Sequence, residues 1–253
     1  MISDLVILFC ALQFVTTFCF LIFEIQIYLL KKFAVIVAAG SGTRMGSDMP
    51  KQFLLLKDKP VLWHTLNVFL KAFSDMEIIL VVAKEFIDTA EAIAKSTIDA
   101  SRIKTVSGGD TRFHSVKNGL AHVNDESIVF VHDGVRCLVT EKLIKRCYEE
   151  AMEKGNAVPS TKPVDSIRVE THHGNAIIDR DKIHIIQTPQ TFKSHIIKAA
   201  FEQAYDETFT DEASVAEMMG EKITLIDGEA TNIKITQPID LAIAEKILEQ
   251  FQV

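Results

Sequence analysis

The sequence has few of the residues that mark small secreted proteins or nucleic-acid-binding proteins. Four of its 253 residues are cysteine, six are proline and one is tryptophan. With no C-x-x-C and no His or Cys at zinc-ligand spacing, these cysteines exclude a disulfide scaffold and a structural zinc site. Positive charge is not in excess either, because 27 Lys and Arg stand against 34 Asp and Glu. The chain therefore lacks the basic face that nucleic-acid binding needs. We expect Cys137 and Cys147 to be reduced thiols in a reducing cytoplasm.

Long apolar runs are absent from most of the chain but not from its first thirty residues. Of residues 1–30, 23 are apolar and two are charged. An uncharged stretch, residues 5–23, approaches the roughly 20 residues needed to cross a bilayer. With Lys31 and Lys32 after it, this segment predicts one of two things: a membrane anchor that leaves the rest of the chain in the cytoplasm, or a misplaced translation start. Residues 31–253 have the composition of one mildly acidic domain with its own core.

From residue 31 onward, short apolar runs alternate with amphipathic stretches. Continuous apolar runs are typical of buried strands in a parallel sheet, and apolar residues three and four apart are typical of helices. The predicted strands are 33–37, 77–82, 103–106, 127–132, 156–160, 222–226 and 232–236. The predicted helices are 60–73, 84–95, 111–122, 140–154, 193–204, one opening at Thr210 and one from Pro238. This alternation predicts an α/β fold: a Rossmann-like, mostly parallel sheet with helices on both faces.

Between residues 163 and 189 the pattern changes. Polar and apolar residues alternate over 166–170, a His-Gly-Asn turn stands at 173–175, and residues 176–178 are apolar. This is typical of a β-hairpin, here an arm inserted into the α/β domain. Because a two-stranded hairpin is marginally stable by itself, we expect the arm to pack on another surface, for which a second subunit is one candidate.

A glycine-rich turn, Ala-Ala-Gly-Ser-Gly-Thr-Arg-Met-Gly at 38–46, follows the first predicted strand. Backbone N–H groups at such a turn can bind phosphate. The glycine spacing is one residue too long for the dinucleotide fingerprint G-x-G-x-x-G, and Gly40 is not followed by the G-K-[ST] of a Walker loop. Instead the turn is accompanied by two cations, Arg44 and Lys51, which suit a triphosphate.

Six segments, in order, resemble the 2-C-methyl-D-erythritol 4-phosphate cytidylyltransferase family of nucleotidyltransferases. The first is Ala-Ala-Gly-x-Gly-x-Arg-Met from residue 38 with Pro-Lys-Gln at 50–52. The others are G-G-x-x-R-x-x-S-V within 107–116, V-H-D-x-x-R at 131–136, T-P-Q at 188–190, T-D-E-A-S at 210–214 and N-I-K-I-T at 232–236. The resemblance begins at about Phe33, where members of the family normally have their own N-terminus. It therefore favours a misplaced start, at Leu29 or Leu30, over a membrane anchor.

The resemblance implies that CMP passes from CTP to 2-C-methyl-D-erythritol 4-phosphate, with release of pyrophosphate, in the non-mevalonate isoprenoid pathway. By the same resemblance, the residues that stabilise charge and aim the attacking phosphate are Arg44, Lys51, Arg180 and Lys234. The residues implied for CTP are Ala38, Ala39, Gly40, Gly42, Gly108, Gly109, Asp110, Ser115, Asp133, Gly134 and Arg136. Those implied for the polyol phosphate are Asp165, Ser166, Thr188 and Thr210.

The resemblance also implies a metal ion and a partner subunit. Mg²⁺ would be held mostly by the CTP phosphates, with Asp133 as the candidate protein ligand. Arg180, expected on the return strand of the hairpin, would act in the neighbouring site of a homodimer. His132 is expected to be structural.

One position departs from the family pattern, and three other functions stay open. Cys137 stands where the family commonly has proline, which affects the expected loop geometry and not the chemistry. A ribitol 5-phosphate cytidylyltransferase shares nearly all the motifs. A dinucleotide-dependent dehydrogenase is opposed by the glycine spacing, and a non-catalytic nucleotide-binding module is opposed by the presence of Arg44 and Lys51.

Overall fold

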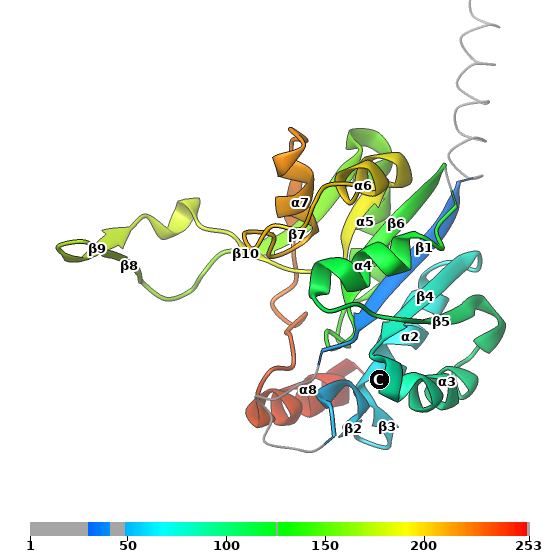
Figure 1. Cartoon of the computed structure of the whole chain (residues 1–253). Helices are drawn as coiled ribbons and strands as arrows, with labels where there is room; N and C mark the ends of the chain where they lie inside the picture. Colours follow the sequence, from blue (N-terminus) through cyan, green and yellow to red (C-terminus); the bar gives the residue numbers. More distant parts are fainter. Residues whose placement is uncertain (1–29, 41–48, 125, 252–253) are drawn as a thin grey trace, which may run out of the picture.

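The computed structural model of the chain describes residues 30–40, 49–124 and 126–251 (Figure 1). The apolar segment 1–29 and the turn residues 41–48, which include Gly42 and Arg44, lie outside the described residues. In the part that is described, no helix is long and apolar enough to cross a membrane.

An eight-stranded sheet runs through the described chain. Its order is β10-β7-β11-β6-β1-β4-β5, with β12 also paired to β7. Strands β5, β4, β1 and β6 are parallel to one another, whereas β11 is antiparallel to both β6 and β7. The prediction of a mostly parallel sheet is therefore confirmed. The strand bounds are β1 Lys31–Ala38, β4 Met76–Val82, β5 Ile103–Ser107, β6 Ser127–Asp133, β7 Asn156–Thr161, β10 Ile185–Ile186, β11 Gln190–Lys193 and β12 Leu225–Asp227.

Helices cover both faces of this sheet, as the alternating pattern predicts (Figure 1). Successive side chains of β1 point to opposite faces: Ala34 and Ile36 join one apolar core, and Phe33 and Val35 join the other. The first core includes side chains of α2 (Val61–Ala72), α3 (Ile87–Lys95) and α5 (Glu141–Lys154). The second includes side chains of α4 (Arg112–Leu120), α6 (Ser194–Ala200) and α7 (Glu212–Met218). The C-terminal α8 (Pro238–Phe251) packs by Ala244 into a third, smaller cluster.

The hairpin predicted within 163–189 is present and extends away from the sheet (Figure 1). It consists of β8 (Ile167–Thr171) and β9 (Gly174–Ile178), paired antiparallel. The chain then passes through the short 3-10 helix η5 (Arg180–Lys182) and returns to the sheet at β10. Arg180 is thus in η5, and its predicted place on the return strand is wrong. Its side chain instead donates from Nη1 to the Val164 carbonyl at 2.8 Å, across the base of the arm.

Three further expectations differ from the structure. Residues 232–236 form no strand, because they are held by separate contacts: Ile235 N–H donates to the Val135 carbonyl at 3.0 Å, and Arg136 donates to the Asn232 carbonyl at 2.9 Å. Strand β11 was not predicted, since it begins at the glutamine of the T-P-Q motif and directly precedes a helix. The helix expected to open at Thr210 is capped by Asp211, whose carboxylate accepts from Ser214 N–H while the Ser214 hydroxyl bonds back to the cap.

Candidate active site

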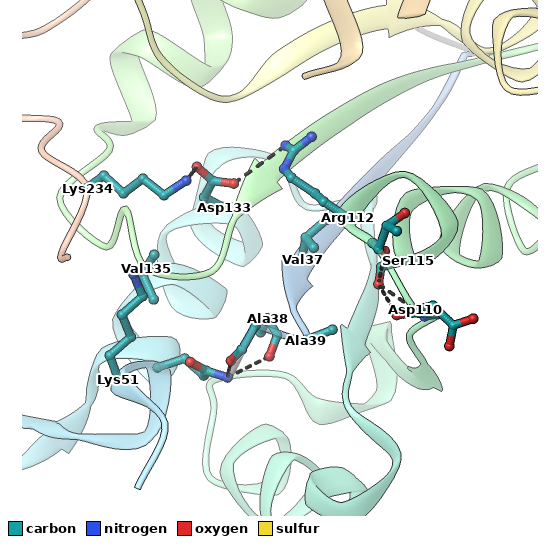
Figure 2. Close-up of a pocket in the computed structure, with 14 residues that line it drawn as sticks. Val37, Ala38, Ala39, Lys51, Asp110, Arg112, Ser115, Asp133, Val135 and Lys234 are labelled. Carbon is teal, nitrogen blue, oxygen red and sulfur yellow. Dashed lines mark hydrogen bonds and ion pairs between the residues drawn. The ribbon is translucent and has the colours of Figure 1, made fainter. Parts of the chain in front are cut away.

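A pocket of about 510 Å³ opens at the carboxyl ends of β1, β5 and β6 (Figure 2). From β1 the chain builds β4 and β5 on one side and then crosses to β6 on the other side of β1. Ligands of open α/β sheets bind at such a switch point. The pocket is lined by Val37, Ala38, Ala39, Gly40, Lys51, Gln52, Gly109, Asp110, Thr111, Arg112, Ser115, Asp133, Val135 and Lys234. Nine of these are residues that the sequence indicated for the site.

The turn after β1 forms one wall of the pocket, and a buried glutamine holds its backbone. Gln52 Nε2 donates to the Ala38 carbonyl at 2.7 Å and to the Gly40 carbonyl at 3.0 Å. Gln52 follows Lys51 in the short 3-10 helix η2 (Lys51–Phe53), so the same helix fixes the turn and presents Lys51 to the pocket. Gln52 belongs to the Pro-Lys-Gln motif, but sequence reasoning did not assign it to the site.

The turn after β5 forms the opposite wall. Ser115 Oγ accepts a hydrogen bond from Gly109 N–H at 3.1 Å and donates to the Thr111 carbonyl at 2.9 Å. Gly108 lies just behind, where its N–H donates to the Val82 carbonyl at 2.7 Å. A Cβ at Gly108 would lie 2.7 Å from the Ala39 Cβ, so glycine is what lets the two turns approach each other.

Asp133, the last residue of β6, carries a negative charge among three cations. Its carboxylate lies 2.9 Å from Lys234 Nζ and 3.5 Å from both Arg112 Nη2 and Arg136 Nε. Burial alone would raise the pKa of Asp133, but Arg112, Lys234 and Arg136 outweigh it and hold that pKa well below its ordinary value. The carboxylate is therefore ionised at neutral pH, and it draws Lys234 and Arg112 to one side of the pocket (Figure 2).

Arg112 lines the pocket, and its positive charge is paired with the buried carboxylate of Glu212. Its guanidinium binds the Glu212 carboxylate through two nitrogens, at 2.5 and 3.0 Å. Glu212 is completely buried, whereas the Arg112 side chain is 31% exposed. Burial would lower the pKa of Arg112, but the carboxylates of Glu212 and Asp133 raise it instead. Both residues stand in motifs of the sequence, G-G-x-x-R and T-D-E-A-S, so the signal was present although neither was assigned.

Behind Asp133, a second set of groups is buried and uncharged. Thr188 Oγ1 lies 3.1 Å from Asp133 N and 3.0 Å from His132 Nδ1, and His132 Nε2 lies 3.1 Å from the Arg136 carbonyl. Burial lowers the pKa of His132 to about 3, so its ring is neutral at physiological pH. Gly134 adjoins this set, with its N–H donating to the Val37 carbonyl at 2.9 Å.

The structure does not bring all the predicted residues to the pocket of this chain. Arg136, Gly108 and Gly134 support it without lining it. Thr210 is exposed in the loop before α7. Asp165, Ser166 and Arg180 are exposed at the base of the arm, and none of the three lines the pocket.

No group of three or more His, Cys, Asp or Glu side chains suited to a metal ion occurs within residues 30–40, 49–124 and 126–251. The pocket lining does include two carboxylates, Asp110 and Asp133. That number agrees with Mg²⁺ bound through one or two carboxylates together with phosphate oxygens and water. It does not agree with a metal ion held by protein side chains alone.

Fold and pocket together define the class: an α/β protein with a switch-point pocket whose glycine turns and cations suit a phosphorylated nucleotide. Comparison with known proteins identifies the family within this class. The family model described as "IspD: 2-C-methyl-D-erythritol 4-phosphate cytidylyltransferase" matches residues 33–250. The chain therefore belongs to this family.

Individual relatives agree with this assignment. Proteins named 2-C-methyl-D-erythritol 4-phosphate cytidylyltransferase from Phocaeicola vulgatus and Bacteroides thetaiotaomicron are 42% and 43% identical over 219 residues, covering 87% of this chain and 100% of each relative. The crystal structure of 4-diphosphocytidyl-2C-methyl-D-erythritol synthase from Anaerococcus prevotii is 29% identical, with a TM-score of 0.76 over 88% of this chain and 98% of that one.

Proposed function

We propose that this protein transfers CMP from CTP to 2-C-methyl-D-erythritol 4-phosphate. The products are 4-diphosphocytidyl-2-C-methyl-D-erythritol and pyrophosphate, in the non-mevalonate isoprenoid pathway. The observation that carries the proposal is the convergence of charge on one pocket: Lys234 lies 2.9 Å from Asp133, and Lys51 and Arg112 line the same walls. Membership of the family supplies the substrates, since its relatives are named for this reaction.

The chemistry needs little beyond positioning and charge. A phosphate oxygen of the polyol phosphate attacks the α-phosphorus of CTP and forms a P–O bond, while the bond to the β-phosphate oxygen breaks and its electron pair leaves with pyrophosphate. No covalent enzyme intermediate is required, because both the nucleophile and the leaving group are already good. In this proposal Lys51 and Arg44 stabilise the negative charge that develops, and Lys234 aims the attacking phosphate.

A divalent cation, Mg²⁺ in our proposal, would enter with the triphosphate and neutralise part of its charge. Asp133 would be its protein ligand, and phosphate oxygens and water would supply the rest. The lowered pKa of Asp133 supports this role, because the carboxylate stays ionised at neutral pH. The cations around Asp133 would then be shared between that carboxylate and the phosphates.

The arm is proposed to complete a second subunit's site in a homodimer. Val164, Val169 and Ile177 are 87%, 47% and 74% exposed along it, an apolar surface that a partner would cover. Arg180, together with Asp165 and Ser166 at the base of the arm, would then contact the polyol phosphate bound to the partner. A cytoplasmic location is proposed from the soluble substrates and from the free thiols of Cys137 and Cys147.

The direct test is release of pyrophosphate from CTP by the purified full chain with Mg²⁺ and 2-C-methyl-D-erythritol 4-phosphate. We expect turnover with this acceptor, much slower turnover with ribitol 5-phosphate, and none with ATP in place of CTP. Faster turnover with ribitol 5-phosphate would assign the protein to the other polyol.

A variant pair tests the pocket itself. Lys51→Ala is expected to lower turnover by about 10²–10³, the usual effect of removing one preorganised electrostatic group. Lys95→Ala is the matched control, because this lysine of α3 is 75% exposed and does not line the pocket. Wild-type turnover in Lys51→Ala would contradict the proposed role.

A further inference from the structure

Thr188 occupies a place behind the pocket. The residue is 5% exposed, and it does not line the pocket. The resemblance in sequence implies a contact between this threonine and the polyol phosphate. Such a contact needs a hydroxyl that can donate, because the oxygens of an ionised phosphate accept hydrogen bonds.

The partners of His132 decide the direction of each hydrogen bond around Thr188. The Arg136 carbonyl can only accept, so His132 Nε2, 3.1 Å away, carries a hydrogen. The His132 ring is fully buried, and a neutral imidazole carries one hydrogen, which the Arg136 carbonyl places on Nε2. Nδ1 is therefore the acceptor.

The Thr188 hydroxyl consequently both donates one hydrogen bond and accepts another within the protein. Its hydrogen points to His132 Nδ1 at 3.0 Å, and its oxygen accepts the Asp133 N–H at 3.1 Å. The backbone of Thr188 adds a third tie: its carbonyl accepts from Asn232 Nδ2 at 2.9 Å, and the Asn232 carbonyl accepts from Arg136 at 2.9 Å. Asn232 stands two residues before Lys234.

We infer that Thr188 and His132 are positioning residues that hold the backbone of Asp133 and Arg136 in place and that do not bind the substrate phosphate. The relay runs from Asp133 N–H to the Thr188 hydroxyl, to His132 Nδ1, and from His132 Nε2–H to the Arg136 carbonyl. It fixes both ends of the turn that carries two of the charges next to the pocket. The consequence for catalysis rests on the proposed function, whereas the hydrogen bonds do not.

Steady-state kinetics separate the two roles of Thr188. Thr188→Val keeps the shape but leaves two buried groups without a partner, so we expect kcat to fall about 10- to 100-fold. The KM values for CTP and for the polyol phosphate should change less than about threefold, since ground-state binding is not lost. Thr188→Ser, which keeps the hydroxyl, should restore most of kcat. A rise confined to the KM for the polyol phosphate would overturn the inference.

Two controls accompany this comparison. Thr191→Val removes the hydroxyl of another buried threonine, on β11 opposite Ala157 and Phe130 and outside the pocket, and should leave kcat near wild type. Combining Thr188→Val with His132→Phe tests the relay as a unit. The double variant should be no slower than the slower single variant, whereas multiplying losses would show independent roles.

Nuclear magnetic resonance of ¹⁵N-labelled histidine provides a readout that does not depend on activity. In the wild-type chain at pH 7, the His132 signal should be that of the neutral Nε2–H tautomer. Thr188→Val should move the Nδ1 resonance toward that of an unbonded acceptor, and Thr191→Val should not. A protonated ring or the Nδ1–H tautomer would overturn the relay. If the relay is seen but the wild-type chain does not release pyrophosphate with either polyol, the proposed function fails and the relay stands.

Discussion

Adding one methyl group at Gly108 should destabilise the protein and disturb the pocket together. The new Cβ would lie 2.7 Å from the Ala39 Cβ and 2.9 Å from Ser115 Oγ. Both separations are well below an ordinary contact of about 3.5–4.0 Å between carbon atoms. Overpacking of this kind lowers the free energy of unfolding by about 1–3 kcal/mol. Because both neighbours line the pocket, any relaxation that relieves the clash displaces a wall of the site.

A methyl group added at Gly40 should leave the stability of the protein nearly unchanged and weaken nucleotide binding. A Cβ there would meet no described atom within 4 Å, so the free energy of unfolding should change by less than about 0.5 kcal/mol. Gly40 nevertheless lines the pocket, at the turn where a triphosphate would approach the backbone. We expect Gly40→Ala to weaken CTP binding about tenfold.

Urea denaturation and calorimetric titration with CTP and Mg²⁺ measure the two effects separately. Ala39→Gly removes the closer of the two clashing atoms, so the double variant Ala39→Gly with Gly108→Ala should regain part of the lost stability. Two results would refute the reasoning: equal destabilisation by Gly40→Ala and Gly108→Ala, or wild-type CTP affinity in Gly40→Ala.

Three other predictions follow from charged groups. Arg112→Met leaves the buried Glu212 carboxylate without its partner and should lower the free energy of unfolding by about 3–5 kcal/mol. Glu212→Gln leaves a partly exposed guanidinium and should lower the free energy of unfolding by less. Urea denaturation of the two variants measures the difference. Burial would raise the pKa of Asp240, but hydrogen bonds from the Thr236 and Gln237 amides outweigh it and lower that pKa. The carboxylate therefore stabilises the fold above its unfolded pKa of about 3.9 and loses this effect as pH falls through the folded value, so Asp240→Asn should flatten the acid side of the stability curve. Cys137 and Cys147 are buried, and burial raises the pKa of each thiol to about 12, so both should react with a thiol reagent at pH 8 only after denaturation. Peptide mapping that finds rapid labelling of Cys137 or Cys147 in the native chain would contradict this.

Local patterns predicted the elements of this fold well where a segment is buried between two helical layers. The apolar run at 33–37 is too short for a helix and predicted a buried strand, and the structure extends it to Lys31–Ala38. Patterns failed where distant contacts decide the conformation. The segment 232–236 has the sequence pattern of a strand, yet it pairs with no strand of the sheet. A hydrogen bond from Ile235 N–H to the Val135 carbonyl and another from Arg136 to the Asn232 carbonyl hold it beside the pocket.

Much of the pocket lining could be predicted because three of the motifs stand at the ends of the strands β1, β5 and β6, and the carboxyl ends of parallel strands meet at one edge. The ion pairs and hydrogen bonds among the pocket residues could not be predicted from the sequence. The pairing of Arg112 with Glu212 joins residues 100 positions apart, at the first turns of two helices whose closeness only the packed sheet creates. The position of Thr188 behind Asp133 depends likewise on β11 pairing antiparallel with β6, which no local pattern indicated.

Cys137, the departure from the family pattern, shows how packing can replace a stiff residue. Proline restricts a loop through its own backbone. Here the loop after β6 is held from outside: Cys137 is 5% exposed and packs in a small core with Leu56, Leu138 and Ile235. Hydrogen bonds within the loop do the rest, since Arg136 N–H donates to the Asp133 carbonyl at 3.0 Å. The geometry of Asp133 and Arg136 is therefore set by the core below them and by the His132 relay behind them, and it does not require a proline at this position.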